Sequence, residues 1–252
     1  MAMGIFLTTL LLFLLQTGRA IAAVNFHAEL FQRKETIVID PGHGGEDGGT
    51  VGINGVQEKE VNLAVALALR DLLVQDHYHV VMIREGDYAV GDRSLAELME
   101  RKRSDIHSRL QTVVETGDCI YVGIHQNNFS QSKYSGAQTF YSVNHEGSAL
   151  LAEKIQTQIV QTLQRENTRE IKASGDQIYI LKNCQVPAVL VECGFLSNPA
   201  EAEKLIDPQY QREMASAIFQ GIQDYYGAEP VPPFLSDSVS SVSNDDKGKS
   251  TE

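Results

Sequence analysis

The feature that most constrains the fold is a regular alternation of short β-branched segments with longer segments of helical periodicity. The short segments are rich in Val, Ile and Tyr and are mostly bounded by turn residues, which predicts strands. The longer segments repeat their apolar residues at helical spacing. The predicted strands are 37–40, 79–84, 119–125, 137–143, 177–181 and 188–193, and the predicted helices are 57–75, 95–115, 147–166 and 208–226. Strands that alternate with helices predict an α/β fold whose sheet is covered on both faces.

The two ends of the 252-residue chain differ from this alternating region. Residues 5–15 form a short apolar run, and Ala20-Ile21-Ala22 follows it in an A-x-A pattern. Such a run predicts a signal peptide or an N-terminal anchor over residues 1–25, and therefore an exported protein. From residue 228 the chain is rich in Ser and Pro and has no periodicity, which predicts a disordered tail over 228–252. One folded domain then occupies 26–227.

Charge and cysteine content exclude some partners and chemistries. The net charge is −12, which argues against a nucleic-acid partner, because phosphate binding needs a basic surface. The acidic balance also provides no general attraction to an anionic membrane or wall. Cys119, Cys184 and Cys193 all lie in or beside apolar, strand-like segments. This favours buried, small hydrophobic side chains over a disulfide or a thiol nucleophile.

Chemically active side chains follow the ends of three predicted strands. His43 lies in a glycine-rich loop after the first strand, His125 ends the third, and Glu192 lies near the end of the last. In sheets of this class, ligands bind outside the carboxyl ends of the strands. The loop around His43 could cradle a phosphate, but Glu46 and Asp47 place negative charge there and no helix follows directly. A metal ion suits an imidazole among glycines better, and a loop histidine without a role stays open.

Helical phase distinguishes two glutamates at the start of the helix predicted over 57–75. At about 100° per residue, Glu58 lies on the face that carries Val61, Val65 and Leu69, whereas Glu60 points nearly the opposite way. A carboxylate on a core-facing surface is unusual unless it is paired or bound to metal. The alternative for both is an acidic side chain stabilised by the helix dipole. Glu58, which lies on the core-facing side of the helix, is therefore the candidate ligand.

Glu192 follows four apolar residues, 188–191, so its carboxylate faces an apolar setting unless it turns to solvent at the strand end. Burial without a partner would be costly, so the group needs a cation or a catalytic use. An apolar environment would also raise its pKa, which suits a general base or acid. Two histidines and one glutamate form the three-ligand set of a catalytic zinc site, with a fourth position left for water. His43, Glu58 and His125 match that set, with Glu192 as the proton shuttle.

Four ordered segments carry a family resemblance: "VIDPGHGGEDGG", "EKEVNL", "GIHQNN" and "AVLVECGFLSNP". They resemble the motifs of the zinc-dependent N-acetylmuramoyl-L-alanine amidases of type 3, over residues 36–226. Within that family, "SGAQTFYSVN" and "ENTREIKAS" are similar to the CwlD-type germination-specific amidases of spore formers. Gln126 and Cys193 depart from the usual pattern, which has Ala or Leu after the histidine and an aliphatic residue after the glutamate.

The resemblance implies a single domain with a roughly six-stranded, mixed but mostly parallel sheet and helices on both faces. It implies Zn2+ held by His43, Glu58 and His125, with Glu192 as the catalytic glutamate and Arg109 as a structural or substrate-positioning residue. The expected reaction is hydrolysis of the amide between N-acetylmuramic acid and L-alanine in peptidoglycan.

The narrower resemblance to the germination-specific amidases implies a role in muramic-δ-lactam maturation of the spore cortex. The protein would act in the cell wall or in the forespore intermembrane space. A protein activator and an N-terminal membrane anchor are further partners to consider. Two alternatives stay open: a zinc peptidase that acts within the stem peptide, and a non-catalytic wall-binding regulator.

Overall fold

The computed structural model describes residues 35–53 and 55–227. The expected signal peptide or anchor at 1–25 and the expected tail at 228–252 therefore lie outside the described residues. Among the helices described, none combines the length and apolar character needed to cross a membrane.

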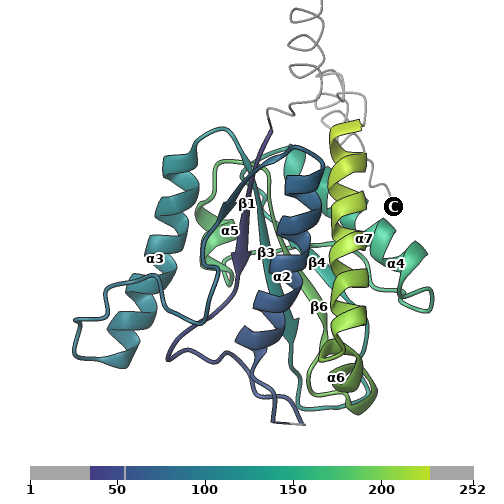
Figure 1. The fold of residues 1–252 in the computed structure, drawn as a ribbon, viewed down its shortest axis with the longest axis horizontal. Helices are drawn as coiled ribbons and strands as arrows, with labels where there is room; N and C mark the ends of the chain where they lie inside the picture. Colours follow the sequence, from purple (N-terminus) through teal and green to yellow (C-terminus); the bar gives the residue numbers. More distant parts are fainter. Residues whose placement is uncertain (1–34, 54, 228–252) are drawn as a thin grey trace, which may run out of the picture.

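Six strands form one sheet in the order β2-β1-β3-β6-β4-β5 (Figure 1). Strands β2, β1, β3 and β6 are parallel, β4 runs antiparallel to β6, and β5 is parallel to β4. This arrangement confirms the expected mixed, mostly parallel sheet. The strands are β1 (Thr36–Pro41), β2 (His79–Met82), β3 (Ile120–Asn127), β4 (Gln138–Tyr141), β5 (Lys172–Ala173) and β6 (Ala188–Phe195).

The central strands are apolar because both of their faces are covered. In β1, Ile37 and Ile39 join the core on one side of the sheet, and Val38 joins the core on the other. All three side chains are fully buried. Continuous apolar runs of this kind are typical of parallel strands with helices on both faces.

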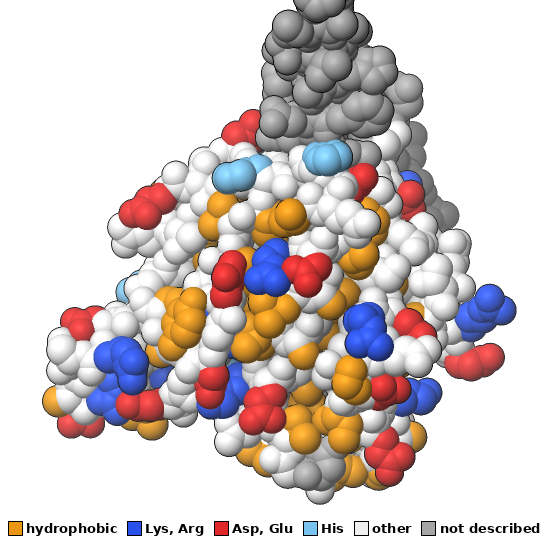
Figure 2. All heavy atoms as spheres, in the orientation of Figure 1, with side chains coloured by type: hydrophobic (Ala, Val, Ile, Leu, Met, Phe, Trp, Pro, Cys, Tyr) orange, Lys and Arg blue, Asp and Glu red, His pale blue; other side chains and the backbone are white. Residues whose placement is uncertain are grey.

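Helices α2, α4 and α7 pack on one face of the sheet, and α3 and α5 pack on the other (Figure 1). Acidic, basic and hydrophobic side chains are interspersed over the face drawn in Figure 2. Because β1 leads into α2 through the glycine-rich loop, the first turn of α2 lies near the carboxyl ends of the parallel strands. The helices are α2 (Glu58–Gln75), α3 (Leu98–Thr116), α4 (Gly147–Thr162), α5 (Tyr179–Asn183), α6 (Pro199–Leu205) and α7 (Pro208–Gly227).

One predicted strand is wrong. Residues 177–181 do not form a strand: the helix α5 occupies Tyr179–Asn183, and the fifth strand of the sheet is β5 instead. Ile180, Leu181 and Cys184 are buried together, at a spacing that fits one face of a helix. The side-chain amide of Asn144 also donates hydrogen bonds to carbonyl groups at the end of this helix, 2.6 Å to Lys182 O and 3.1 Å to Cys184 O. Such tertiary partners decide between helix and strand in a short apolar run.

The short helix α6 was not predicted, although its start signal is visible in the sequence. The side chain of Asn198 accepts hydrogen bonds from the backbone N–H groups of Ala200 and Glu201, and Pro199 occupies the first turn. Asparagine followed by proline is typical of a helix start. The cysteines agree with their prediction: all three are buried and unpaired.

Candidate metal centre

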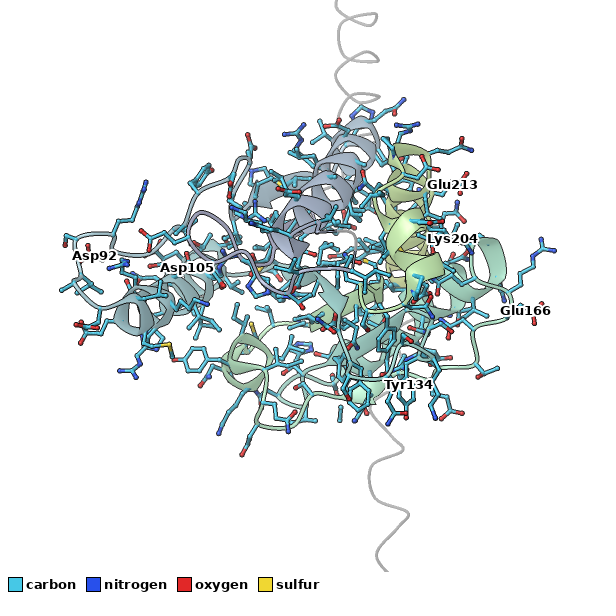
Figure 3. All side chains as sticks on the ribbon, turned by 90° about the horizontal axis from the view of Figure 1, so that it is seen from below. Asp92, Asp105, Tyr134, Glu166, Lys204 and Glu213 are labelled. Atoms are coloured by element: carbon cyan, nitrogen blue, oxygen red, sulfur yellow. The ribbon has the colours of Figure 1, made fainter. Side chains whose placement is uncertain are left out.

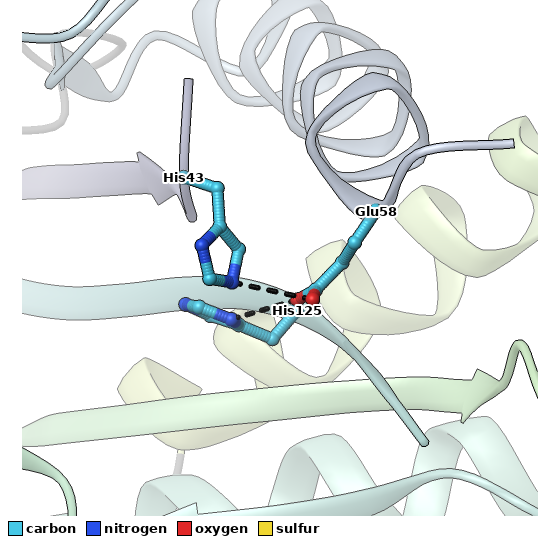
Figure 4. A group of neighbouring side chains, drawn as sticks. All are labelled: His43, Glu58 and His125. Carbon is cyan, nitrogen blue, oxygen red and sulfur yellow. Dashed lines mark hydrogen bonds and ion pairs between the residues drawn. The ribbon is translucent and has the colours of Figure 1, made fainter. Parts of the chain in front are cut away.

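Two imidazoles and one carboxylate converge at the carboxyl edge of the sheet (Figure 4). Nε2 of His43 lies 3.2 Å from Oε2 of Glu58, and Nδ1 of His125 lies 3.0 Å from Oε1 of the same carboxylate. One candidate ligand atom from each residue lies within 4.8 Å of the other two. Three residues that are far apart in the sequence thus present donor atoms to one small volume, which is the arrangement of a metal site.

His43 enters the centre through an unusual backbone conformation. Its φ angle is 62°, in the left-handed region that costs a non-glycine residue roughly 1–2 kcal/mol. Nδ1 of its ring lies 2.8 Å from Oδ2 of Asp47, and the other oxygen of Asp47 accepts a hydrogen bond of 2.8 Å from Lys102. The carboxylate therefore fixes the ring orientation and leaves Nε2 directed at Glu58. This is how a second carboxylate commonly orients a metal-binding histidine.

Glu58 is the first residue of α2 and is only 4% exposed. Its Oε2 accepts a hydrogen bond of 3.0 Å from the backbone N–H of Thr50, and its Oε1 accepts one of 3.1 Å from that of Gln126. The amide of Asn62, one turn further along the helix, also donates to Oε1 at 3.3 Å. Glu60, by contrast, is exposed. The structure thus agrees with the helical phase of the sequence, and it holds Glu58 rigidly toward both histidines.

The glycines of the loop make room for the centre itself. A Cβ atom on Gly42 would lie 2.2 Å from Cε1 and Nε2 of His125. A Cβ atom on Gly49, where φ is 68°, would lie 2.6 Å from Oε2 of Glu58 and 2.7 Å from Cδ2 of His43. These approaches are far shorter than any van der Waals contact. Glycine is therefore required at both positions so that the three side chains can meet.

The pKa values of His43 and Glu58 are shifted in opposite directions by their contacts. Burial alone would lower the pKa of His43, but the carboxylates of Asp47 and Glu58 outweigh it and raise that pKa to about 9. Burial alone would raise the pKa of Glu58, but the two imidazoles hold it well below its usual range. Without a metal ion, the centre therefore retains a proton on an imidazole. A cation is favoured at this position, and a bound metal would displace that proton.

Glu192 lies on β6 directly beside His125, its partner in the parallel pairing with β3. Its Oε2 atom is buried and has no hydrogen-bond partner among the described residues. Burial, followed by the repulsion of Glu58, raises the pKa of Glu192 to about 7, although His125, His43 and Arg169 oppose that shift. The structure thus places next to the three donors a carboxyl group that can both accept and donate a proton near neutral pH.

Arg109 lies behind the centre and does not face it. This buried side chain of α3 donates to Asp105 at 2.6 Å, to the carbonyl of Pro41 at 3.0 Å and to the carbonyl of His43 at 2.6 Å. It also forms a buried ion pair with Asp40. Burial alone would lower the pKa of Arg109, but these carboxylates raise it above its ordinary value. Its contacts fix the backbone that carries His43, which is a positioning role.

Several supporting residues were not singled out from the sequence. Arg84 is fully buried and donates to the carbonyls of Pro41, Gly42 and Lys59 at 2.8 to 3.0 Å. Asn62 links the Gly42 carbonyl to Glu58. An arginine at the end of a strand and an asparagine in a helix give no sign of such contacts. Asp47 was noted only as a negative charge, although its position four residues after His43 could have indicated a partner for the imidazole.

The donor set fits a zinc ion. Two imidazole nitrogens and one carboxylate oxygen are the protein ligands of several catalytic zinc sites, which keep a further position open. The orienting carboxylate of Asp47 and the hydrogen bonds to Glu58 supply the outer contacts that such ligands need.

Comparison with known proteins identifies the family of the chain. Residues 37–224 match the family described as N-acetylmuramoyl-L-alanine amidase. The germination-specific N-acetylmuramoyl-L-alanine amidase of Bacillus subtilis is 36% identical over 197 residues, which cover 78% of this chain and 82% of that protein. The structure of the CwlD amidase from Clostridioides difficile, in complex with the GerS lipoprotein, is 37% identical with a TM-score of 0.74, over 77% of this chain and 99% of that one. The chain therefore belongs to the N-acetylmuramoyl-L-alanine amidase family, and it is an amide hydrolase that acts on peptidoglycan.

Proposed function

We propose that hydrolysis of the bond between N-acetylmuramic acid and L-alanine is zinc-dependent in this protein, with His43, Glu58 and His125 as the metal ligands. The observation that carries this proposal is the convergence of both imidazoles on the buried carboxylate of Glu58, at 3.2 and 3.0 Å. When bound, zinc supplies Lewis acidity, which polarises a carbonyl group and lowers the pKa of water.

Glu192 transfers the protons of the reaction. With a pKa raised to about 7, its carboxylate can accept the proton of the attacking water and return it to the departing nitrogen of L-alanine. Because its Oε2 atom has no hydrogen-bond partner in the described chain, no protein contact has to break before the proton moves. Asp47 meanwhile holds the His43 ring, and Arg109 holds the His43 backbone.

Substitution of Glu192 tests this assignment. Glu192→Gln should retain one zinc ion per chain but lose most of the release of L-alanine amino groups from purified peptidoglycan. Glu60→Gln is the matched control, because it changes an exposed glutamate outside the centre and should leave both properties unchanged. A fully active Glu192→Gln variant would disprove the catalytic role. Mass analysis of the products also separates the amidase from a peptidase that cuts within the stem peptide.

The protein acts outside the cytoplasm, on cell-wall or spore-cortex peptidoglycan, and residues 1–25 direct its export or anchor it. Support comes from the germination-specific relative of Bacillus subtilis and from the Clostridioides difficile amidase that is bound to a lipoprotein. The latter also supports a protein partner for this chain. A strain without this protein should form spores whose cortex lacks muramic-δ-lactam. Normal lactam in the cortex muropeptides would contradict the spore role.

A further inference from the structure

An open hollow of about 290 Å³ lies beside the proposed zinc centre. It is lined by Asn127, Phe129, Tyr134, Arg169 and Phe195. Asn127 ends β3 shortly after His125, and Phe195 ends β6 shortly after Glu192. Because these two strands pair side by side, the hollow begins at the same sheet edge as the centre. The hollow is therefore within reach of a substrate held at the centre.

Aromatic rings form the walls of this hollow. The Tyr134 ring meets the Phe129 ring edge-on, with centroids 5.0 Å apart, and stacks on the Phe195 ring at 6.3 Å with an angle of 29° between the ring planes. Phe129 is 48% exposed and Tyr134 is 37% exposed, so the rings present apolar faces to solvent. Figure 3 views the molecule from this side and labels Tyr134. The walls suit the aliphatic part of a peptide.

Arg169 is the cationic residue in the lining of the hollow, and the ammonium of Lys133 lies 5.4 Å from the Tyr134 ring centroid. Its guanidinium carbon lies 5.1 Å from the Phe195 ring centroid, and its Nη2 donates to the side-chain carbonyl of Gln138. Gln138 is the partner of Glu192 in the antiparallel pairing of β4 with β6, so the residue that accepts from Arg169 lies beside Glu192.

The guanidinium of Arg169 is available to bind a ligand. Among the described residues, no carboxylate lies within ion-pair distance of Arg169, although its charge acts on the more distant Glu192 and opposes the rise in the pKa of that group. The buried Nε of Arg169 has no hydrogen-bond partner. Its backbone is fixed on both sides, because its N–H donates to Asn167 at 2.9 Å and its carbonyl accepts from Gln156 at 3.0 Å. Because Nε is buried, a carboxylate ligand would reach the guanidinium through its Nη atoms.

We propose that this hollow binds the peptide side of the substrate and that Arg169 determines specificity by binding the carboxylate next to L-alanine. This inference rests on the proposed function. The muramic acid side is neutral, since its lactyl carboxyl is engaged in the amide that is cut. The next residue of the stem is glutamate joined through its side chain, so its α-carboxylate is the nearest anion. A planar guanidinium matches such a carboxylate with two parallel hydrogen bonds.

Two substrates that differ in one group test the proposal. They are N-acetylmuramoyl-L-alanyl-D-glutamate and its D-isoglutamine counterpart, in which a carboxamide replaces the α-carboxylate. The zinc-loaded full chain should cleave the acid with a kcat/KM higher by roughly tenfold to a hundredfold, the range for a hydrogen bond to a charged group. Arg169→Gln should reduce that ratio to about one, and Arg169→Lys should retain part of it.

The control is Lys172→Gln, which removes the same charge from β5, where the ammonium lies over the Phe140 ring outside the hollow. It should preserve the preference for the acid. If Arg169 only supported Phe195 and Gln138, its substitution would slow both substrates equally and leave their ratio unchanged. That result, or equal cleavage of both substrates by the unaltered protein, would overturn the proposal.

Binding of the product peptide separates this inference from the proposed function. L-alanyl-D-glutamate should bind at least tenfold more tightly than its D-isoglutamine counterpart in calorimetry, and Arg169→Gln should abolish the difference. Failure to cleave either substrate, together with this binding difference, would contradict the proposed function but support the peptide site. Equal binding of the two dipeptides would overturn the peptide site.

Discussion

Substitution of Gly42 by alanine tests whether the metal centre depends on the close approach of the Gly42 backbone to the His125 ring. The added Cβ would lie 2.2 Å from two atoms of the His125 ring, whereas ordinary contact begins at 3.4 Å. The ring must therefore move by more than about 1 Å, several times the tolerance of about 0.2 Å in metal–ligand distances. A misplacement of this size typically costs about a hundredfold in rate.

The assay measures zinc per chain after dialysis and the release of L-alanine amino groups from peptidoglycan. Gly42→Ala should bind zinc at least tenfold more weakly and should lose about a hundredfold in activity. Gly227→Ala is the control, because nothing lies within 4 Å of its added Cβ, and it should match the unaltered protein. Thermal unfolding of both variants verifies that they are folded. Full zinc occupancy and full activity in folded Gly42→Ala would refute the proposed crowding around His125.

Three further predictions concern the side chains that support the centre. Arg109→Met leaves the Asp40 carboxylate buried without its cation and should lower the free energy of unfolding in urea by about 3–5 kcal/mol; a loss below about 1 kcal/mol would contradict the importance of that ion pair. Asp47→Asn should weaken zinc binding by about 10–100-fold in a chelator competition, because the His43 ring loses its orienting carboxylate; unchanged affinity would show that the contact is dispensable. Glu192 in the metal-free protein should titrate near pH 7 in carbon-13 NMR, and zinc should lower that pKa. Because folding raises this pKa from 4.5, its contribution to stability is present below pH 4.5 and is lost as the pH rises through about 7.

The sequence predicted the parts of the fold and of the centre that follow from local periodicity. Alternation of apolar strands and helical segments predicted the sheet and four of the helices. Helical phase distinguished Glu58 from Glu60, and the position of Glu192 after an apolar strand indicated that it belongs to the site. These features depend on neighbours in the sequence, which is why a single chain was enough to predict them.

The features that the sequence did not reveal depend on contacts between distant segments. The segment 177–181 has the composition of a strand, but packing and the contacts of Asn144 make part of it helical. Arg84 donates to carbonyl groups that belong to other elements, and nothing in its own neighbourhood indicates them. The environment of Arg169 likewise depends on distant segments, because its side chain contacts Gln138 on β4 and the Phe195 ring at the end of β6.

The central claim is that His43, Glu58 and His125 together hold one zinc ion. Anomalous diffraction at the zinc absorption edge, from crystals of the zinc-loaded full chain, tests it directly. We expect one anomalous peak within coordination distance, about 2.0–2.2 Å, of an imidazole nitrogen of each histidine and of a Glu58 oxygen. A zinc peak bound by other residues, or no peak at this position in fully active crystals, would contradict it.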